Sequence, residues 1–190
     1  MLFDFSSSPF LVPLLAAVTA RLMAIFIRRA AAILDMRLWW LANVFALTAA
    51  SFLGLSFYWA MILGPQRIPG ETGTWMLLGQ VMIIAGALVT LLGLMEMGPG
   101  AFLVTPRSTL ISKGLYARIR RPMDAGVLVV SVGAALVQGS PGAWMWSLLW
   151  IPLSLALSEL EEWELRNRIP AAGAYFDHTP RYLPRRKRHG

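Results

Sequence analysis

Five long apolar stretches restrict what this chain can fold into more than any other feature of its sequence. A helix needs about 20 apolar residues to cross the hydrocarbon core of a bilayer, and the second and third stretches meet this length comfortably. The fourth and fifth are shorter, and only the five residues 138–142 (QGSPG) join them, which predicts a helical hairpin. The stretches cover residues 9–27, 38–63, 75–97, 123–137 and 143–160.

The composition indicates the same class of protein. Hydrophobic residues make up 57% of the 190 residues, charged residues only 14%, and the mean hydropathy is +0.60. Soluble domains usually carry about 25% charged residues, so one small soluble core cannot hide this much apolar surface. We therefore expect an all-α polytopic membrane protein of one domain, with about five transmembrane helices and a C-terminal helical hairpin.

The positions of the basic residues predict the orientation in the membrane. Three follow the first stretch, five follow the third and seven follow the fifth, whereas Arg67 is the one basic residue in the opposite loops. Positive charge accumulates on the cytoplasmic side, which predicts an external N-terminus and a cytosolic C-terminus. The net charge of +7 then reflects topology, and we expect no nucleic-acid partner. Arg21 lies inside a stretch, where it either reaches the surface or a structural partner, or carries a functional charge.

Several kinds of site are excluded or disfavoured. The chain has no cysteine, and its two histidines lie near the C-terminus, so we expect no metal site. It also lacks a P-loop, a GxGxxG motif and a GxSxG motif. Tryptophans near the ends of the stretches are typical of interfacial anchors, and we expect Trp75, Trp144 and Trp146 to mark the outer interface.

A basic cluster precedes the fourth stretch. Arg120 and Arg121 stand directly before Pro122, a residue suited to the first turn of a helix. Free N–H groups and the helix dipole favour an anion at that end. Asp124 in the same turn suits the dipole and is a candidate cap.

An acidic cluster, residues 159–164 (ELEEWE), ends the fifth stretch. Its spacing places Glu159 and Glu162 on one helix face, so one carboxylate can face solvent while a neighbour turns inward. The hairpin would bring the acidic and basic clusters together. Such a pair of clusters either binds a zwitterionic ligand from the cytosol or ties the hairpin together through Arg–Glu pairs.

Two motifs resemble those of the superfamily of isoprenylcysteine carboxyl methyltransferases and phospholipid N-methyltransferases, over residues 94–184. The first family pattern is Leu-Val-x-x-Gly-x-Tyr-x-x-x-Arg-His-Pro-x-Tyr-x-Gly, and the second is Glu-Glu-x-x-Leu followed by Tyr-x-x-x-Val-x-Arg-x-x-Pro. The chain matches the first with Leu110, Ile111, Gly114, Tyr116, Arg120, Pro122 and Gly126, and the second with Glu161, Glu162, Leu165, Tyr175, Arg181 and Pro184.

The resemblance implies S-adenosylmethionine as cofactor, bound at the cytosolic face, and a methyl acceptor that enters from the bilayer. Residues 1–100 would hold three transmembrane helices, and residues 101–190 the cofactor-binding loop, the hairpin and the tail. Glu162 and Arg181 would be catalytic, and Tyr175 and Arg181 would contact the substrate. The implied cofactor site comprises Tyr116, Arg120, Arg121, Pro122, Asp124, Gly126, Glu161 and Glu162.

Three departures from the pattern keep a second function open. Arg121 stands at the family His, Asp124 stands at the family Tyr, and residues 169–173 replace the usual Phe-Gly segment. The first hypothesis is a methyltransferase of a bacterial inner membrane that acts on a lipid-embedded or amphiphilic acceptor, such as phosphatidylethanolamine, an isoprenoid carboxylate or a small thiol. The second is a degenerate relative that serves as a non-catalytic accessory subunit and binds partner subunits of a membrane complex.

Overall fold

The regular elements of the protein are helical throughout the described part of the chain. The computed structural model describes residues 9–33, 38–62, 73–98 and 110–182. Four helices are long and apolar enough to span a membrane, and a fifth apolar helix, α4, is shorter. The prediction of an all-α polytopic membrane protein is confirmed, while its orientation stays a prediction. The elements are α1 (Leu11–Ile33), α2 (Trp39–Ile62), α3 (Gly73–Met97), the 3-10 helix η2 (Gly114–Ala117), α4 (Pro122–Gln138), α5 (Pro141–Arg168) and α6 (Ala172–His178).

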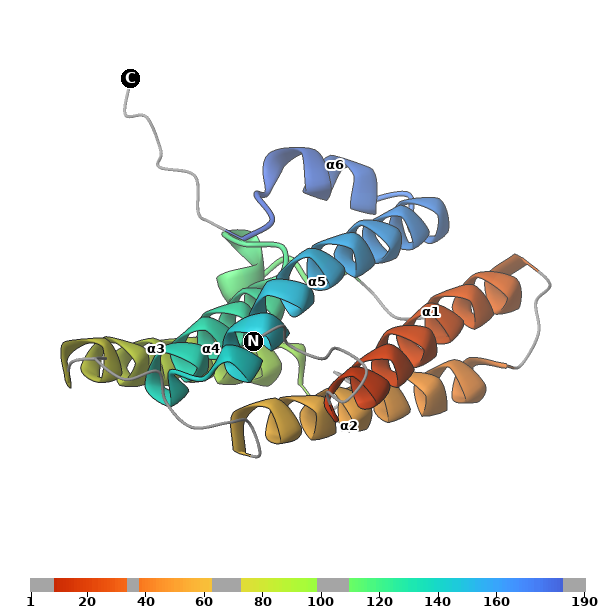
Figure 1. Cartoon of the computed structure of the whole chain (residues 1–190). Helices are drawn as coiled ribbons and strands as arrows, with labels where there is room; N and C mark the ends of the chain where they lie inside the picture. The colour runs from red at the N-terminus through yellow and green to blue at the C-terminus, as the bar shows by residue number, and fades with distance from the viewer. Residues whose placement is uncertain (1–8, 34–37, 63–72, 99–109, 183–190) are drawn as a thin grey trace, which may run out of the picture.

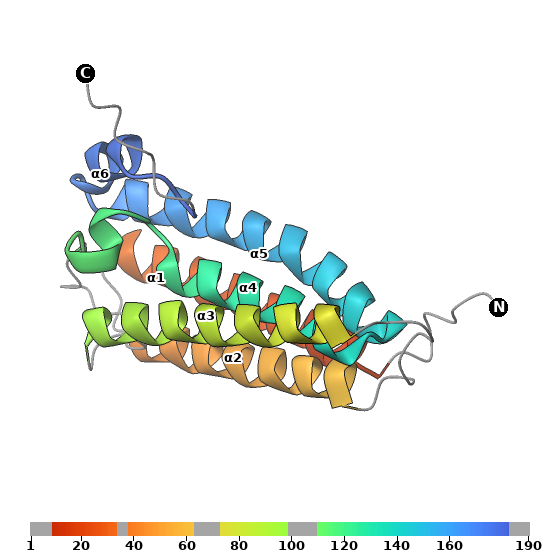
Figure 2. The ribbon, with the colours of Figure 1, turned by 90° about the vertical axis from the view of Figure 1, so that its left-hand side faces the viewer.

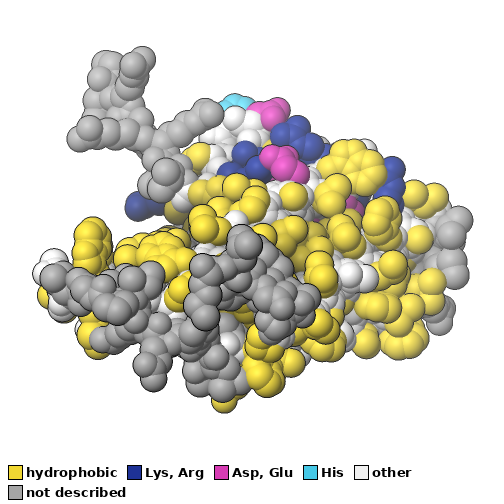
Figure 3. Space-filling model, viewed as in Figure 1, with side chains coloured by type: hydrophobic (Ala, Val, Ile, Leu, Met, Phe, Trp, Pro, Cys, Tyr) yellow, Lys and Arg dark blue, Asp and Glu magenta, His cyan; other side chains and the backbone are white. Residues whose placement is uncertain are grey.

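The long helices form two antiparallel pairs that α5 joins. Helix α1 packs along α2, and α3 packs along α4, whereas α5 contacts α1, α2 and α4 (Figures 1 and 2). The predicted hairpin of α4 and α5 exists as a tight connection, but the most extensive contact of α4 is with α3. Charged side chains gather toward α6 and the end of α5 in Figure 3, and hydrophobic side chains cover much of the other described surface in that view.

Glycines explain the close contact between α3 and α4. Gly79 and Gly86 lie seven residues apart on α3 and face Gly133 and Gly126 on α4. A Cβ atom added to Gly86 would lie 2.6 Å from the carbonyl oxygen of Gly126, and one added to Gly133 would lie 2.7 Å from that of Gly79. Small residues allow helices to approach closely in a membrane, where packing drives association. We call this contact the glycine seam.

Trp146 is a core residue, so its predicted place at the outer interface is wrong. Its side chain is 1% exposed, and its indole Nε1 donates to Ser56 Oγ at 2.7 Å. The ring meets Phe57 edge-on and stacks against Trp150. A buried hydroxyl acceptor and two aromatic partners satisfy both parts of the indole inside the bundle, which removes the need for an interfacial position.

Helix α5 extends beyond the predicted apolar stretch at both ends. The Ser140 hydroxyl caps its start, and the helix continues through the acidic cluster to Arg168. Its 28 residues span about 42 Å, against a hydrocarbon core of about 30 Å. The acidic cluster was expected to close this helix, but the helix continues four residues beyond Glu164, because Glu and Arg end an apolar pattern without ending a helix. The acidic cluster therefore lies on a helical extension rather than at a helix terminus.

Candidate functional site

The site begins where two distant segments run side by side. The Arg120 backbone N–H donates to the Pro180 carbonyl at 2.9 Å, and the Arg121 N–H donates to the Arg181 carbonyl at 3.1 Å. These two bonds join the segment before α4 to the segment after α6. They bring together the two motifs that lie about 60 residues apart in the sequence.

Glu162 forms the centre of the arginine–carboxylate cluster. Its carboxylate accepts from Arg120 at 2.7 Å and from two nitrogens of Arg181 at 2.8 Å each. The Glu162 side chain is only 5% exposed, so both arginines are needed to stabilise its charge. Arg181 also pairs with Glu159, which is solvent-exposed. We expected one carboxylate of the acidic cluster to face solvent while a neighbour turns inward, and the structure shows Glu159 in the first position and Glu162 in the second.

Glu161 extends the cluster to the first helix. Its carboxylate accepts from Arg121 at 2.6 Å and from Arg21 at 2.7 Å, and Arg28 lies 3.6 Å away. Of the alternatives for Arg21, the structure shows the pairing. Because Arg21 and Arg28 belong to α1, these contacts tie the N-terminal helix to α5.

The two residues that depart from the family pattern form an ion pair with each other. Arg121 donates to Asp124 at 3.1 Å, and the same guanidinium donates to the Ser158 carbonyl at 3.1 Å. The Ser158 hydroxyl donates to Asp124 at 3.3 Å, and Tyr182 donates to the Ser158 hydroxyl at 3.1 Å. Asp124 was a candidate cap for α4, but the structure does not use it as one. Its carboxylate is engaged by these side chains, and Arg121 occupies the N-cap position.

The carboxylates keep the site arginines charged. Hydrogen bonds from Arg181 to Glu162 and Glu159 raise the pKa of that guanidinium. Burial lowers the pKa of Arg121, but the charges of Glu161 and Asp124 outweigh burial and raise it. Both groups are therefore permanent cations, and the cluster is suited to holding charge in place rather than to moving protons through arginine.

Tyr116 brings an unpartnered hydroxyl to the same region. Its side chain is 7% exposed, and its hydroxyl has no hydrogen-bond partner in the described part of the chain. Burial raises the pKa of Tyr116, so the phenol remains protonated at neutral pH. Arg120 Nε is also buried without a partner among the described residues. These two atoms are donors available for a ligand.

Two contacts fix the segment that carries Tyr116. The Glu96 carboxylate at the end of α3 accepts from the Leu115 N–H at 2.7 and 2.9 Å. Gly114 has φ +57°, and an added Cβ there would lie 2.2 Å from the Glu96 carboxylate. The Tyr175 hydroxyl donates to the Tyr116 carbonyl. Glycine is therefore required at position 114 for both conformation and space.

The structure brings most of the predicted site residues together. Two of the others lie in the packing between helices: Pro122 is buried in the first turn of α4, and Gly126 belongs to the glycine seam. The sequence did not predict four further residues near the site, nor the place of Arg21 in it; the four are Ser158, Tyr182, Glu96 and Arg28. A charge within an apolar stretch needs a buried partner, and this rule was the available signal for Arg21. The predicted residues that meet in the cluster are Arg120, Arg121, Asp124, Glu161, Glu162 and Arg181.

A family model described as phospholipid methyltransferase matches residues 72–169, about half of the 190 residues. The matched span contains α3, η2, α4 and α5, and with them the glycine seam and the glutamates of the cluster. Comparisons with curated proteins and with solved structures gave no match.

Proposed function

This chain belongs to the phospholipid methyltransferase family, and we propose that it transfers a methyl group from S-adenosylmethionine to a lipid-embedded acceptor. Its family and its apolar helices make it a membrane methyltransferase in general terms. The observation that carries the finer proposal is the pairing of Glu162 with Arg120 and Arg181, which joins both family motifs in one buried cluster.

The chemistry of the cluster fits the proposed cofactor. A guanidinium binds a carboxylate through paired hydrogen bonds, which suits Arg120 and Arg121 to the methionine carboxylate. A carboxylate accepts from an ammonium or a ribose diol, which suits Glu161 and Glu162. The donors on Tyr116 and Arg120 Nε, which have no partner among the described residues, can provide further hydrogen bonds to a ligand. A zwitterionic ligand would replace some of the arginine–carboxylate pairs of the cluster, because its own carboxylate would pair with an arginine and its own ammonium with a glutamate.

The residues of the cluster have distinct roles in the proposed reaction. S-adenosylmethionine supplies a methyl group on a sulfonium, which transfers by in-line displacement without a metal. The protein must align donor and acceptor and exclude water. Arg181 holds the Glu162 carboxylate in position, and Glu162 accepts the proton that an ammonium acceptor loses before its nitrogen attacks. The apolar helices exclude water from the side of the site that faces the membrane.

The same ion pairs favour a second candidate function. Each carboxylate of the cluster already has an arginine partner, which is also what a purely structural brace requires. In that case the chain is a non-catalytic accessory subunit that binds partner chains of a membrane complex. This candidate predicts no cofactor binding and tight co-purification with those chains.

Calorimetric titration of the detergent-purified protein with S-adenosylmethionine separates the two candidates. Glu162→Gln and Glu164→Gln form a matched pair, because both glutamates are buried on α5 and paired with arginine, but Glu164 pairs with Arg168 outside the cluster. The methyltransferase proposal predicts a Kd within about 1 μM–1 mM, the usual KM range, lost in Glu162→Gln and kept in Glu164→Gln. A folded wild-type protein that fails to bind millimolar cofactor supports the accessory subunit instead.

A further inference from the structure

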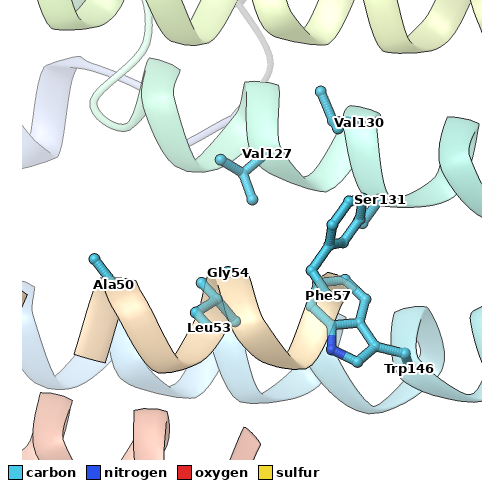
Figure 4. A pocket seen from close by; sticks show the side chains of 8 residues that line it. All are labelled: Ala50, Leu53, Gly54, Phe57, Val127, Val130, Ser131 and Trp146. Carbon is cyan, nitrogen blue, oxygen red and sulfur yellow. The ribbon is translucent and has the colours of Figure 1, made fainter. Parts of the chain in front are cut away.

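A crevice separates the two helix pairs below the arginine–carboxylate cluster. Helices α2 and α4 touch only lightly, and between them a cavity of about 270 Å³ opens on one side, with α5 forming part of its wall. Figure 4 shows side chains of α2 and α4 facing each other across this space. We call it the interpair crevice, and its lining residues are Ala50, Leu53, Gly54, Phe57, Val127, Val130, Ser131 and Trp146.

The lining leaves no hydrogen-bonding group for a polar ligand. The Ser131 hydroxyl already donates to the Leu128 carbonyl at 2.8 Å, and the Ser131 carbonyl accepts from Ser147. The Trp146 N–H is engaged by Ser56. An apolar space among membrane-spanning helices is occupied favourably by hydrocarbon, because a polar group there would lose its hydrogen bonds.

The crevice points toward the charged cluster. Val127 on α4 follows Asp124 by three residues, which is about 4.5 Å along the helix axis. On α2 the lining runs from Ala50 to Phe57, or about 10 Å. An amphiphile with its polar group at the cluster would therefore place the part of one acyl chain nearest its head group in the crevice. The carboxylates and arginines of the cluster at that end suit a head group that carries both signs of charge, and the amine of that head group follows from the proposed methyl transfer.

The volume restricts what fits. Pockets for whole small molecules usually measure about 300–1,000 Å³, so the interpair crevice holds part of a single chain rather than a whole two-chain lipid. Gly54 maintains this space, because a Cβ atom added there would have no neighbour within 4 Å. Gly54 thus differs from the glycines of the seam, where an added Cβ would collide with backbone.

We propose that the interpair crevice binds one acyl chain of an amine-bearing membrane lipid, the methyl acceptor, and that Gly54 determines which chains enter. This proposal rests on the proposed methyltransferase function for the identity of the ligand. The occupancy itself requires no cofactor and no turnover.

Photo-crosslinking in phosphatidylcholine nanodiscs tests the occupancy directly. One sample contains a trace of phosphatidylethanolamine with a diazirine in its acyl chain, and a second contains the same probe on phosphatidylcholine. Labelled residues are mapped by mass spectrometry. Gly54→Phe fills the crevice, and Ala87→Phe is the matched control, because Ala87 lies on the exposed surface of α3. Far-ultraviolet circular dichroism of both variants confirms that they are folded.

The proposal predicts that the phosphatidylethanolamine probe labels Phe57 and Val130 more than the phosphatidylcholine probe does, relative to labelling at exposed Leu88 on α3. Gly54→Phe should lower the crevice labelling by about tenfold, and Ala87→Phe should leave it unchanged. Equal labelling by both probes identifies a bulk lipid and overturns the assignment to the acceptor. Crevice labelling that Gly54→Phe does not reduce overturns the site. Crevice labelling without S-adenosylmethionine binding in the calorimetric test overturns the proposed function but not the crevice.

Discussion

The arginine–carboxylate cluster and the interpair crevice lie within about one helical turn of each other on α4, yet they are built on opposite principles. In the cluster, Glu162 is buried, Glu161 is partly buried, and each is held by two or more arginines. In the crevice, the side chains are apolar and the space between α2 and α4 is unfilled. The polar part of the site is therefore held rigidly before a ligand arrives, while the apolar part leaves room for one.

This difference follows from what each environment requires. A buried charge without a partner destabilises a protein strongly, so charged groups at a membrane interface must be paired. An apolar gap is far less costly, because lipid chains fill it.

Removing the central carboxylate should produce the largest effect. Glu162→Ala leaves Arg120 and Arg181 without their shared partner and should lower the free energy of unfolding by about 3–5 kcal/mol. Glu159→Ala removes an exposed partner of Arg181 and should lower it by about 0–1 kcal/mol. Denaturant titration in detergent measures the free energy of unfolding of both variants. Equal losses would contradict the view that the buried Glu162 stabilises the protein more than the exposed Glu159 does.

The glycine seam supports both regions, because α4 carries Asp124 and the crevice residues alike. Gly126→Leu adds side-chain atoms at a position where a Cβ alone would lie 2.2 Å from Thr90 Oγ1 and 2.5 Å from the Gly86 carbonyl. Overpacking of this kind lowers stability by about 1–3 kcal/mol or more. Gly54→Leu, which has no neighbour to displace, should change stability by no more than about 0.5 kcal/mol. Thermal unfolding of the two variants is the measurement, and a similar loss in both would disprove the close contact at the seam.

The Arg121–Asp124 pair can be examined by restoring the family residues. Arg121→His and Asp124→Tyr should each destabilise the protein, because the first leaves Asp124 without its arginine and the second removes one of the carboxylates that stabilise the Arg121 charge. The double variant should be more stable than the sum of the single changes implies, by about 0.5–3 kcal/mol. Strictly additive losses in a double-mutant cycle would mean that the two departures from the family pattern are independent.

Tyr116 should produce the smallest effect, visible only at high pH. Burial raises the pKa of its phenol above the unfolded value of about 10. The contribution of the protonated phenol is therefore fully present below pH 10 and is lost as the pH rises toward the folded-state pKa. Tyr116→Phe should flatten the fall in Tm above pH 10 while leaving Tm near neutral pH almost unchanged. An unchanged slope would contradict the burial of this hydroxyl.

The sequence predicted the parts of this structure that depend on local pattern. The apolar stretches located α2 and α3 almost to the residue, and the glutamate spacing predicted that Glu159 and Glu162 share a face. The motif resemblance agrees with the family found by comparison. The roles assigned to individual site residues remain predictions that the experiments above address.

The remaining features depend on contacts that no local pattern contains. The partner of Arg21 is 140 residues away, and the burial of Trp146 depends on Ser56 and Phe57 from another helix. The ends of α1 and α5 lie beyond their apolar stretches, because charged residues continue a helix outside the hydrocarbon. For the glycine seam, the sequence does contain a local pattern. Gly79, Gly86 and Gly93 are spaced seven residues apart, which places them on one face of α3 and indicates a close helix contact there.

We propose that the cluster and the crevice are two parts of one methyltransferase site. The most direct test supplies methyl-labelled S-adenosylmethionine to the protein in phosphatidylethanolamine nanodiscs and follows the label in the lipid fraction by mass spectrometry. We expect labelled lipid with the wild type. Glu162→Gln should lose both methyl transfer and cofactor binding. Gly54→Phe should lose methyl transfer but still bind the cofactor. Absence of labelled lipid from a wild type that binds the cofactor, or undiminished transfer by Gly54→Phe, would contradict it.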